Sequence, residues 1–118
     1  MTHEIVGCAI RVHRELGPGL LESVYEVCLL DELCRAGLSV AQQVPCDVAY
    51  KGRVIQSGFR MDLVVEDRVV IELKAVDAIK RVHFAQLMSY LRVSGKRLGL
   101  LINFNEHTLK AGIKRIAL

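Results

Sequence analysis

The sequence has no tryptophan and few other aromatic residues, only three tyrosines and three phenylalanines among 118 residues. Stacking of successive nucleobases on aromatic rings would have few side chains to use, so we expect no extended stacking platform. No apolar run reaches the length of about eighteen residues that a membrane-spanning helix needs, so no membrane segment is expected. The chain does not open with a basic segment followed by an apolar stretch, so no signal peptide is expected.

The four cysteines lack the spacing of a redox pair or a zinc site. Cys8, Cys28, Cys34 and Cys46 form no Cys-x-x-Cys pair, and each lies in an apolar context. We therefore expect reduced structural thiols in a cytoplasmic protein. The length fits one domain over residues 1–118, with no linker or internal repeat. The net charge of +3 permits a nucleic-acid partner without arguing for one.

The stretch from Phe59 to Ala75 has the clearest pattern in the chain. It is rich in Val, Ile and Leu, and it predicts two strands joined by a short polar turn. Successive side chains of a strand point to opposite faces of a sheet. One face of this hairpin should be wholly apolar, made by Met61, Leu63, Val65, Val69, Ile71 and Leu73. The opposite face carries Asp62, Glu72 and Lys74.

The length of the turn decides whether the two carboxylates meet. A turn of two residues would place Asp62 and Glu72 on opposite faces and mix the apolar set. A turn of three residues, 66–68, pairs Val65 with Val69. Asp62 then lies directly opposite Glu72. Because a slip of one residue turns every side chain to the other face, burial of the apolar face favours the three-residue turn.

Opposed carboxylates on neighbouring strands are a candidate metal site. The Cβ atoms of directly opposed residues are about 5 Å apart. Two carboxylates this close repel each other unless a proton or a cation lies between them. With Lys74 on the same face, a divalent metal is the natural occupant, and oxygen ligands favour Mg²⁺ or Mn²⁺. The hairpin alone leaves a second interpretation open, a solvated face with weak ion pairs.

Two helices are expected before the hairpin. Apolar residues at helical spacing predict a first helix over Thr2–Leu16 and a second from about Leu20 to Ala36. Gly17-Pro18-Gly19 separates them with a sharp reversal. Glu22 shares a stripe with Tyr25 on the second helix, so its carboxylate is expected to face inward. It either interacts with the helix N-terminal dipole or supplies a third acidic group to the hairpin.

The segment between the second helix and the hairpin predicts two more strands. Ser39–Tyr50 is expected to be one strand, and Pro45 within it favours an edge or a bulge. Lys51-Gly52 marks a turn that leads to Val54–Gln56. Together with the hairpin, these strands are expected to form an antiparallel meander.

The second half of the chain predicts a crossover connection. A helix over Ile79–Val93 leads to Leu98–Asn103, an apolar run typical of a buried strand. That strand should pair parallel to Val69–Ala75. Gly112–Leu118 predicts a last strand. The expected fold is α/β, with a mixed central sheet flanked by helices in the order α-α-β-β-β-β-α-β-β.

Three motifs resemble those of known nucleases. Gly19-Leu20-Leu21-Glu22-Ser23-Val24-Tyr25 matches the Gly-x-x-Glu-x-x-Tyr motif of the GxxExxY proteins, a family within the PD-(D/E)xK superfamily. Asp62, nine further residues and then Glu72-Leu73-Lys74 resemble the superfamily signature, with Met61 where the name has Pro. Gln86-Leu87-Met88-Ser89-Tyr90 is similar to the Gln-x-x-x-Tyr motif of RecB-like members. The similarity runs from about Ile5 to the C-terminus.

The resemblance implies a restriction-endonuclease-like core and a metal-dependent nuclease that hydrolyses phosphodiester bonds, with DNA as the expected polymer. The cofactor would be Mg²⁺ or Mn²⁺. The implied metal ligands are Asp62, Glu72, the Leu73 carbonyl and Glu22. Lys74 would orient the attacking water. Gln86 and Tyr90 would orient Lys74 or contact the nucleic-acid backbone, and the alternative for both is a polar flank that hydrogen-bonds the sheet.

A function of a different class stays open on the sequence. The chain could be a non-catalytic module that keeps the nuclease fold and binds nucleic acid or a protein partner. Its small size and modest charge support this, because little surface is left to grip a duplex, although a homodimer would enlarge that surface. The intact set of Asp62, Glu72 and Lys74 argues against it. Fold resemblance alone does not settle chemistry.

Overall fold

A computed structural model describes residues 1–118. The helices are α1 (Thr2–Leu16), α2 (Glu22–Arg35) and α3 (Arg81–Ser94), with a short 3-10 helix, η1 (Leu109–Gly112). The strands are β1 (Val40–Pro45), β2 (Val48–Tyr50), β3 (Arg53–Ile55), β4 (Arg60–Val65), β5 (Val69–Lys74), β6 (Leu98–Asn103) and β7 (Ile113–Ala117). None of the helices combines the length and the apolar character that crossing a membrane requires.

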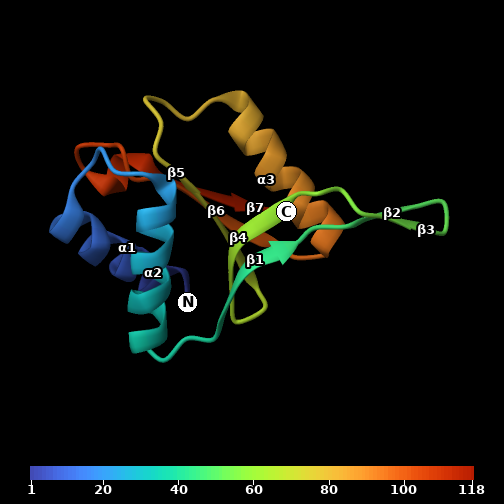
Figure 1. The fold of residues 1–118 in the computed structure, drawn as a ribbon, viewed down its shortest axis with the longest axis horizontal. Coiled ribbons are helices and arrows are strands. Elements are labelled where there is room, and N and C mark those ends of the chain that lie inside the picture. Colours follow the sequence, from blue (N-terminus) through green and yellow to red (C-terminus); the bar gives the residue numbers. More distant parts are fainter.

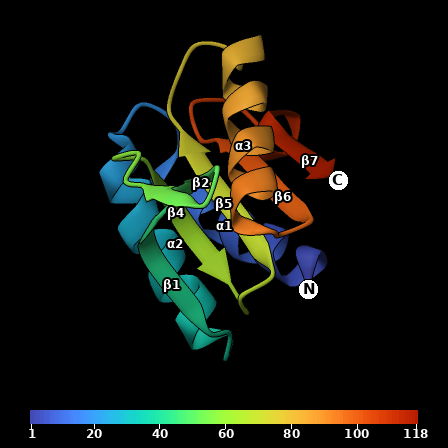
Figure 2. The ribbon, with the colours of Figure 1, turned by 90° about the vertical axis from the view of Figure 1, so that its right-hand side faces the viewer.

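A five-stranded mixed sheet forms the middle layer, in the order β1-β4-β5-β6-β7. β5 and β6 run parallel and are joined through α3, whereas the other neighbours are antiparallel. α1 and α2 cover one face of the sheet and α3 covers the other (Figures 1 and 2). This confirms the expected α/β class, the mixed sheet between helices and the parallel pairing of Leu98–Asn103.

The β4–β5 hairpin has the register that the three-residue turn predicts. Val65 pairs with Val69, and Leu63 pairs with Ile71. Glu66 and Asp67 in the turn both have a positive φ. Leu63, Val65, Val69, Ile71 and Leu73 all belong to the core cluster beneath α1 and α2, as expected. Burial of this apolar face holds the register, because a slip would expose it.

Met61 departs from the expected apolar face. It packs in the second core cluster, beneath α3, whereas Leu63 packs beneath α1 and α2. Met61 pairs with Val44 of β1, and the preceding β1 residue, Gln43, has a φ of 51°. A left-handed residue in a strand interrupts the regular alternation of side chains. The assignment of Met61 to the same face as Leu63 is therefore wrong.

The stretch expected to be one strand, residues 39–50, forms two. β1 ends at Pro45, whose ring leaves no N–H for further pairing. β2 and β3 then form a separate two-stranded sheet, so β1 pairs directly with β4 and the expected meander does not form. We call residues 46–59 the arm. It projects from the body of the molecule (Figure 1).

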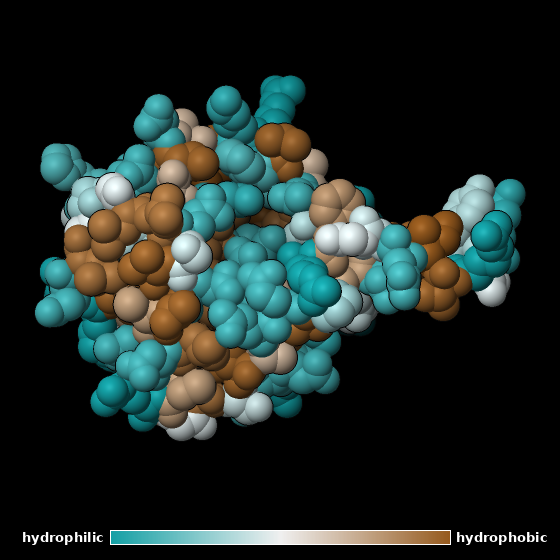
Figure 3. Space-filling model, in the orientation of Figure 1, coloured by the Kyte–Doolittle hydropathy of each residue, from teal (hydrophilic) through white to brown (hydrophobic).

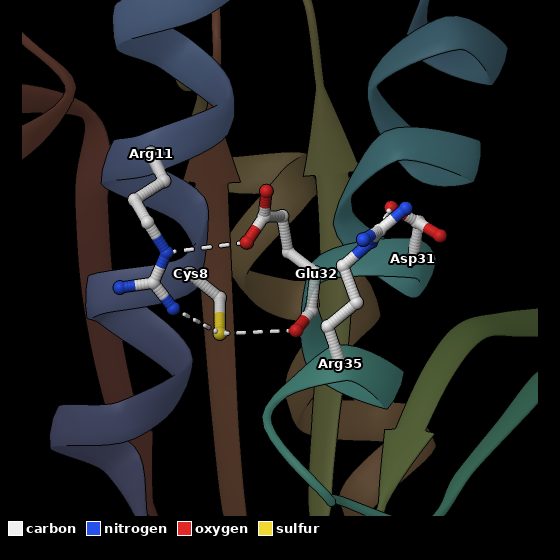
Figure 4. A network of polar contacts seen from close by, with 5 residues as sticks. All are labelled: Cys8, Arg11, Asp31, Glu32 and Arg35. Carbon is white, nitrogen blue, oxygen red and sulfur yellow. Dashed lines mark hydrogen bonds and ion pairs between the residues drawn. The ribbon is translucent and has the colours of Figure 1, made fainter.

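Polar contacts join α1 to α2. Arg11 Nε donates to Glu32 Oε2 at 3.1 Å, and Arg11 Nη2 donates to Cys8 Sγ at 3.2 Å (Figure 4). The Cys8 thiol in turn donates to the Glu32 carbonyl oxygen at 3.7 Å. Burial raises the pKa of the Cys8 thiol, so the group stays neutral and acts as part of the packing. All four cysteines are free.

Tyr25 fixes the turn between α1 and α2. Its hydroxyl donates to the Gly17 carbonyl and accepts a hydrogen bond from the Leu20 N–H at 3.1 Å. Its buried ring stacks on Phe104 with the ring centroids 4.6 Å apart. The tyrosine of the Gly-x-x-Glu-x-x-Tyr segment therefore ties the turn to the hydrophobic core.

Replacing Tyr25 with phenylalanine should lower the free energy of unfolding by about 1–2 kcal/mol, because the Gly17 carbonyl and the Leu20 N–H lose their partner while the ring stacking remains. Urea unfolding followed by circular dichroism measures the difference. Tyr50→Phe is the control, since the Tyr50 hydroxyl is exposed and makes no hydrogen bond, and it should stay within about 0.5 kcal/mol of the wild type. Equal stability of Tyr25→Phe and Tyr50→Phe would contradict the structural role of Tyr25.

Candidate functional site

Asp62 on β4 and Glu72 on β5 lie side by side, as the three-residue turn predicts. The Asp62 backbone N–H donates to Glu72 Oε2 at 2.8 Å. The Leu73 backbone N–H donates to Asp62 Oδ2, also at 2.8 Å. Each carboxylate thus accepts an N–H of the opposite strand, beyond the last regular pair, Leu63 and Ile71. These reciprocal bonds fix the two side chains relative to each other.

Burial makes this carboxylate pair hold a proton. Glu72 is only 4% exposed, and Asp62 is half-buried. Burial, with the nearby charge of Asp62, raises the pKa of Glu72 to about 8. Burial also raises the pKa of Asp62, against the lowering effect of the Leu73 N–H. The interpretation of this face as solvated with weak ion pairs is therefore wrong. At neutral pH the pair keeps a proton where a cation could lie.

One oxygen of each carboxylate is left over for a cation. Asp62 Oδ1 has only a weak contact, 3.5 Å from Gln43 Nε2. Glu72 Oε1 accepts no hydrogen bond, and it reaches solvent, because no buried polar side-chain atom lacks a partner. No three acidic, histidine or cysteine side chains are grouped to hold a metal. Two carboxylates suit Mg²⁺, which usually keeps several waters and takes further oxygens from phosphates.

Lys74 ends β5 beside this pair. Its side chain is half-buried and makes no hydrogen bond or ion pair. Against the raising effect of burial, its charge lowers the pKa of both Asp62 and Glu72. The structure therefore places the ammonium close enough to influence both carboxylates and leaves it free for another partner.

Asn103 fixes the chain that follows Lys74, and the sequence-based predictions assign no functional role to this residue. It is fully buried and pairs with Lys74 across β5 and β6. Asn103 Oδ1 accepts from the Val76 N–H at 3.1 Å, and Asn103 Nδ2 donates to the Val76 carbonyl at 2.9 Å. The sequence does contain a signal for this role, because Asn103 is the single amide at the end of the otherwise apolar run of β6.

Tyr90 and Gln86 project from α3. Burial, reinforced by the charge of Glu72, raises the pKa of Tyr90 to about 12. The Tyr90 ring lies 6.2 Å from that of Phe59, between centroids. Gln86, one turn earlier, is half-buried. Neither side chain hydrogen-bonds the sheet, although the Tyr90 ring is buried in the second core cluster, beneath α3. The roles of both residues stay predictions.

Glu22 lies in the first turn of α2, exposed and without a hydrogen bond or ion pair. Its expected inward orientation is wrong, because the helix meets the core only from Tyr25 onward. Glu26, one turn later, accepts bonds from Gln42 at 2.7 Å and Gln43 at 2.9 Å. After burial, its charge contributes to the raised pKa of Asp62. The structure thus brings Glu26 towards the carboxylate pair and leaves Glu22 free.

A mixed sheet between helices, with two opposed carboxylates and a lysine at neighbouring strand ends, defines a restriction-endonuclease-like fold. The family model of the PD-(D/E)XK nuclease superfamily matches residues 1–116. The chain belongs to this superfamily, whose members are generally nucleases and typically use divalent metals. Comparison with curated proteins and with solved structures gave no match.

Without metal, the free energy of unfolding should fall as the pH rises from about 5 to about 8. Glu72 keeps its proton in the folded state up to a pKa of about 8, against an ordinary value of 4.5. The folded state binds more protons than the unfolded chain between these values, so it loses stability as the pH rises. Urea unfolding in a chelating buffer measures this fall.

Glu72→Gln cannot ionise, so its stability should fall less than that of the wild type over the same range. Glu15→Gln is the control, because Glu15 is exposed and unpaired, and its pH dependence should match the wild type. Identical pH dependence in all three proteins would contradict the buried, protonated state of Glu72.

Proposed function

We propose that the protein is a magnesium-dependent nuclease of the GxxExxY group that hydrolyses phosphodiester bonds of DNA. The observation that carries this proposal is the buried carboxylate of Glu72 against Asp62, with the unpaired ammonium of Lys74 two residues further on. Membership of the nuclease superfamily supports the chemistry. The Gly19–Tyr25 segment supports the group, and the restriction-endonuclease-like core favours DNA.

Asp62 Oδ1 and Glu72 Oε1 would hold the Mg²⁺, which would replace the proton that the pair keeps. Bound there, the ion supplies the Lewis acidity that phosphodiester hydrolysis needs. The Leu73 carbonyl would be a further ligand. Glu22 is exposed and does not converge with the two carboxylates, so its contribution would pass through water. Glu72 Oε2 and Asp62 Oδ2 already accept hydrogen bonds from the N–H groups of Asp62 and Leu73. These two bonds would keep both carboxylates in place.

Lys74 would act on the attacking water. Its free ammonium can donate hydrogen bonds to the water and to a phosphate oxygen, and its charge offsets the charge that develops on the phosphate. Asn103 holds the chain after Lys74 and so limits where the ammonium can reach. Tyr90 keeps its hydroxyl proton up to about pH 12, so it is a neutral donor for a phosphate oxygen. Gln86 would assist from the preceding turn.

Cleavage of labelled DNA in the presence of Mg²⁺ tests the proposal. Lys74→Ala and Asp62→Ala should each lower the rate by about 10²-fold or more, because both remove electrostatic stabilisation made in the transition state. Lys114→Ala is the control, since Lys114 is exposed on β7, and it should keep the wild-type rate. Single- and double-stranded DNA and RNA are compared in the same assay, which also tests the choice of polymer.

Two results would contradict the nuclease. One is the absence of cleavage of all four substrates by the wild type. The other is cleavage that survives in both Lys74→Ala and Asp62→Ala. Binding of nucleic acid without any cleavage would instead favour the non-catalytic module that keeps the fold.

Magnesium should also raise the thermal stability of the protein. A ligand that binds only the folded state at about a hundred times its Kd stabilises it by about 2.7 kcal/mol. Asp62→Asn and Glu72→Gln should abolish this stabilisation, because each removes a charged ligand. Glu22→Gln should weaken it, and Glu26→Gln is the matched comparison from the same helix. If Mg²⁺ stabilises Asp62→Asn as much as the wild type, the metal binds elsewhere. If Glu26→Gln weakens the stabilisation more than Glu22→Gln does, Glu26 and not Glu22 is the third acidic residue.

A further inference from the structure

The arm leaves apolar side chains in solvent. β2 and β3 pair only with each other, and an isolated two-stranded hairpin is marginally stable in water. Val54 is 75% exposed, Tyr50 is 55% exposed and Ile55 is 42% exposed. Figure 3 shows the arm standing off the body with hydrophobic and hydrophilic surface side by side. Exposed apolar side chains on so slender an element indicate a contact surface.

The tip of the arm is positively charged. Lys51 lies in the turn, with its Nζ 5.4 Å from the centre of the Tyr50 ring. Arg53 pairs with Tyr50 across the two strands. Asp47 is the only acidic residue between positions 46 and 59. A partner for this surface is therefore anionic and also offers apolar area, and a nucleic acid has both, in its phosphates and its base edges.

The base of the arm adjoins the carboxylate site. The Cys46 N–H donates to the Phe59 carbonyl at 3.0 Å and closes the arm. The exposed Phe59 ring then faces the ring of Tyr90, with 6.2 Å between centroids. Asp62 follows Phe59 after only two residues, on β4, so the base of the arm leads directly into the carboxylate pair. A ligand held along the arm would therefore continue to Asp62 and Glu72.

The dimensions of the arm suit a duplex. Each paired strand has three residues, which extend over about 10 Å. The major groove of B-form DNA is about 12 Å wide and about 8.5 Å deep, and it admits a two-stranded β-ribbon. The arm is thus long enough to lie in the groove between the phosphates on its two sides while the body stays outside.

We propose that the arm enters a groove of double-stranded nucleic acid and holds the duplex against the Asp62–Glu72 site. Lys51 and Arg53 contact phosphates, and Val54 contacts base edges. The inference rests on the proposed nuclease function for its biological sense. Its test measures binding without metal, so that failure of the arm and failure of catalysis are separate results.

The test is fluorescence anisotropy of a labelled 20-base-pair duplex with the full chain, in a chelating buffer over a series of salt concentrations. Neutralising one phosphate contact lowers the slope of log K against log salt by about 0.9. The double variant Lys51→Gln/Arg53→Gln should therefore lose about 1.8 of the wild-type slope. Val54→Ser should weaken binding without changing the slope, because an apolar contact releases no counterions.

Arg14→Gln/Lys110→Gln is the matched control. It removes the same two charges from exposed positions on α1 and η1, which lie at the end of the molecule opposite the arm (Figure 1). Its slope and affinity should equal those of the wild type. An equal loss in both double variants would show that only the net charge matters and would overturn the proposal.

Three further results would overturn it. The first is duplex binding by the arm variant that matches the wild type. The second is no duplex binding by the wild type at all. The third comes from analytical ultracentrifugation of the same proteins without nucleic acid. A wild-type dimer that becomes a monomer on Val54→Ser would mean that a second copy of the chain covers the arm.

Discussion

The reciprocal bonding of Asp62 and Glu72 is the constraint on which the site depends. Each carboxylate accepts the N–H of the opposing strand, so neither side chain can move without leaving a backbone group unpaired. The hydrophobic layers above and below the sheet limit the contact of both groups with water, although Asp62 is only half-buried. Burial of two like charges is unfavourable unless a proton or a cation accompanies them. The fold thus places an excess of negative charge at one position and leaves its compensation to a ligand.

The rest of the molecule surrounds this position with polar groups on three sides. Lys74 follows Glu72 on the same strand, and Tyr90 approaches from α3 on the opposite layer. On the side of α2, Glu26 and Gln43 are joined by a hydrogen bond beside Asp62. Cationic, neutral and acidic groups therefore meet around one pair of strands. The proposed binding of a metal ion and a phosphate relies on this arrangement.

The local features of the fold could be predicted from the sequence. The period-two pattern of Phe59–Ala75 and the length of its turn determine the register, because only one register buries the apolar face. The parallel pairing of β5 and β6 follows from the intervening helix. The register needs only residues that are close in sequence, and the parallel pairing needs only the order of the elements along the chain, so both predictions are confirmed.

The predictions that were wrong concern features that depend on contacts between distant segments. Met61 packs in the second core cluster, opposite a segment of β1 in which Gln43 has a left-handed conformation. The departure of the arm after Pro45 depends on β1 pairing with β4, twenty residues further along. Glu22 shares its stripe with Tyr25, but only the position at which α2 meets the sheet decides which of the two is buried. Asn103 likewise has its partner, Val76, in the loop that follows β5.

In the proposed site, the Asp62–Glu72 pair holds a proton, and a metal ion replaces that proton when it binds. Calorimetric titration with Mg²⁺ at about pH 7, in two buffers of different ionisation enthalpy, measures that exchange directly. With the pKa of Glu72 at about 8, binding should release close to one proton per ion. Binding without proton release, or no binding by the folded protein, would contradict the account of this site.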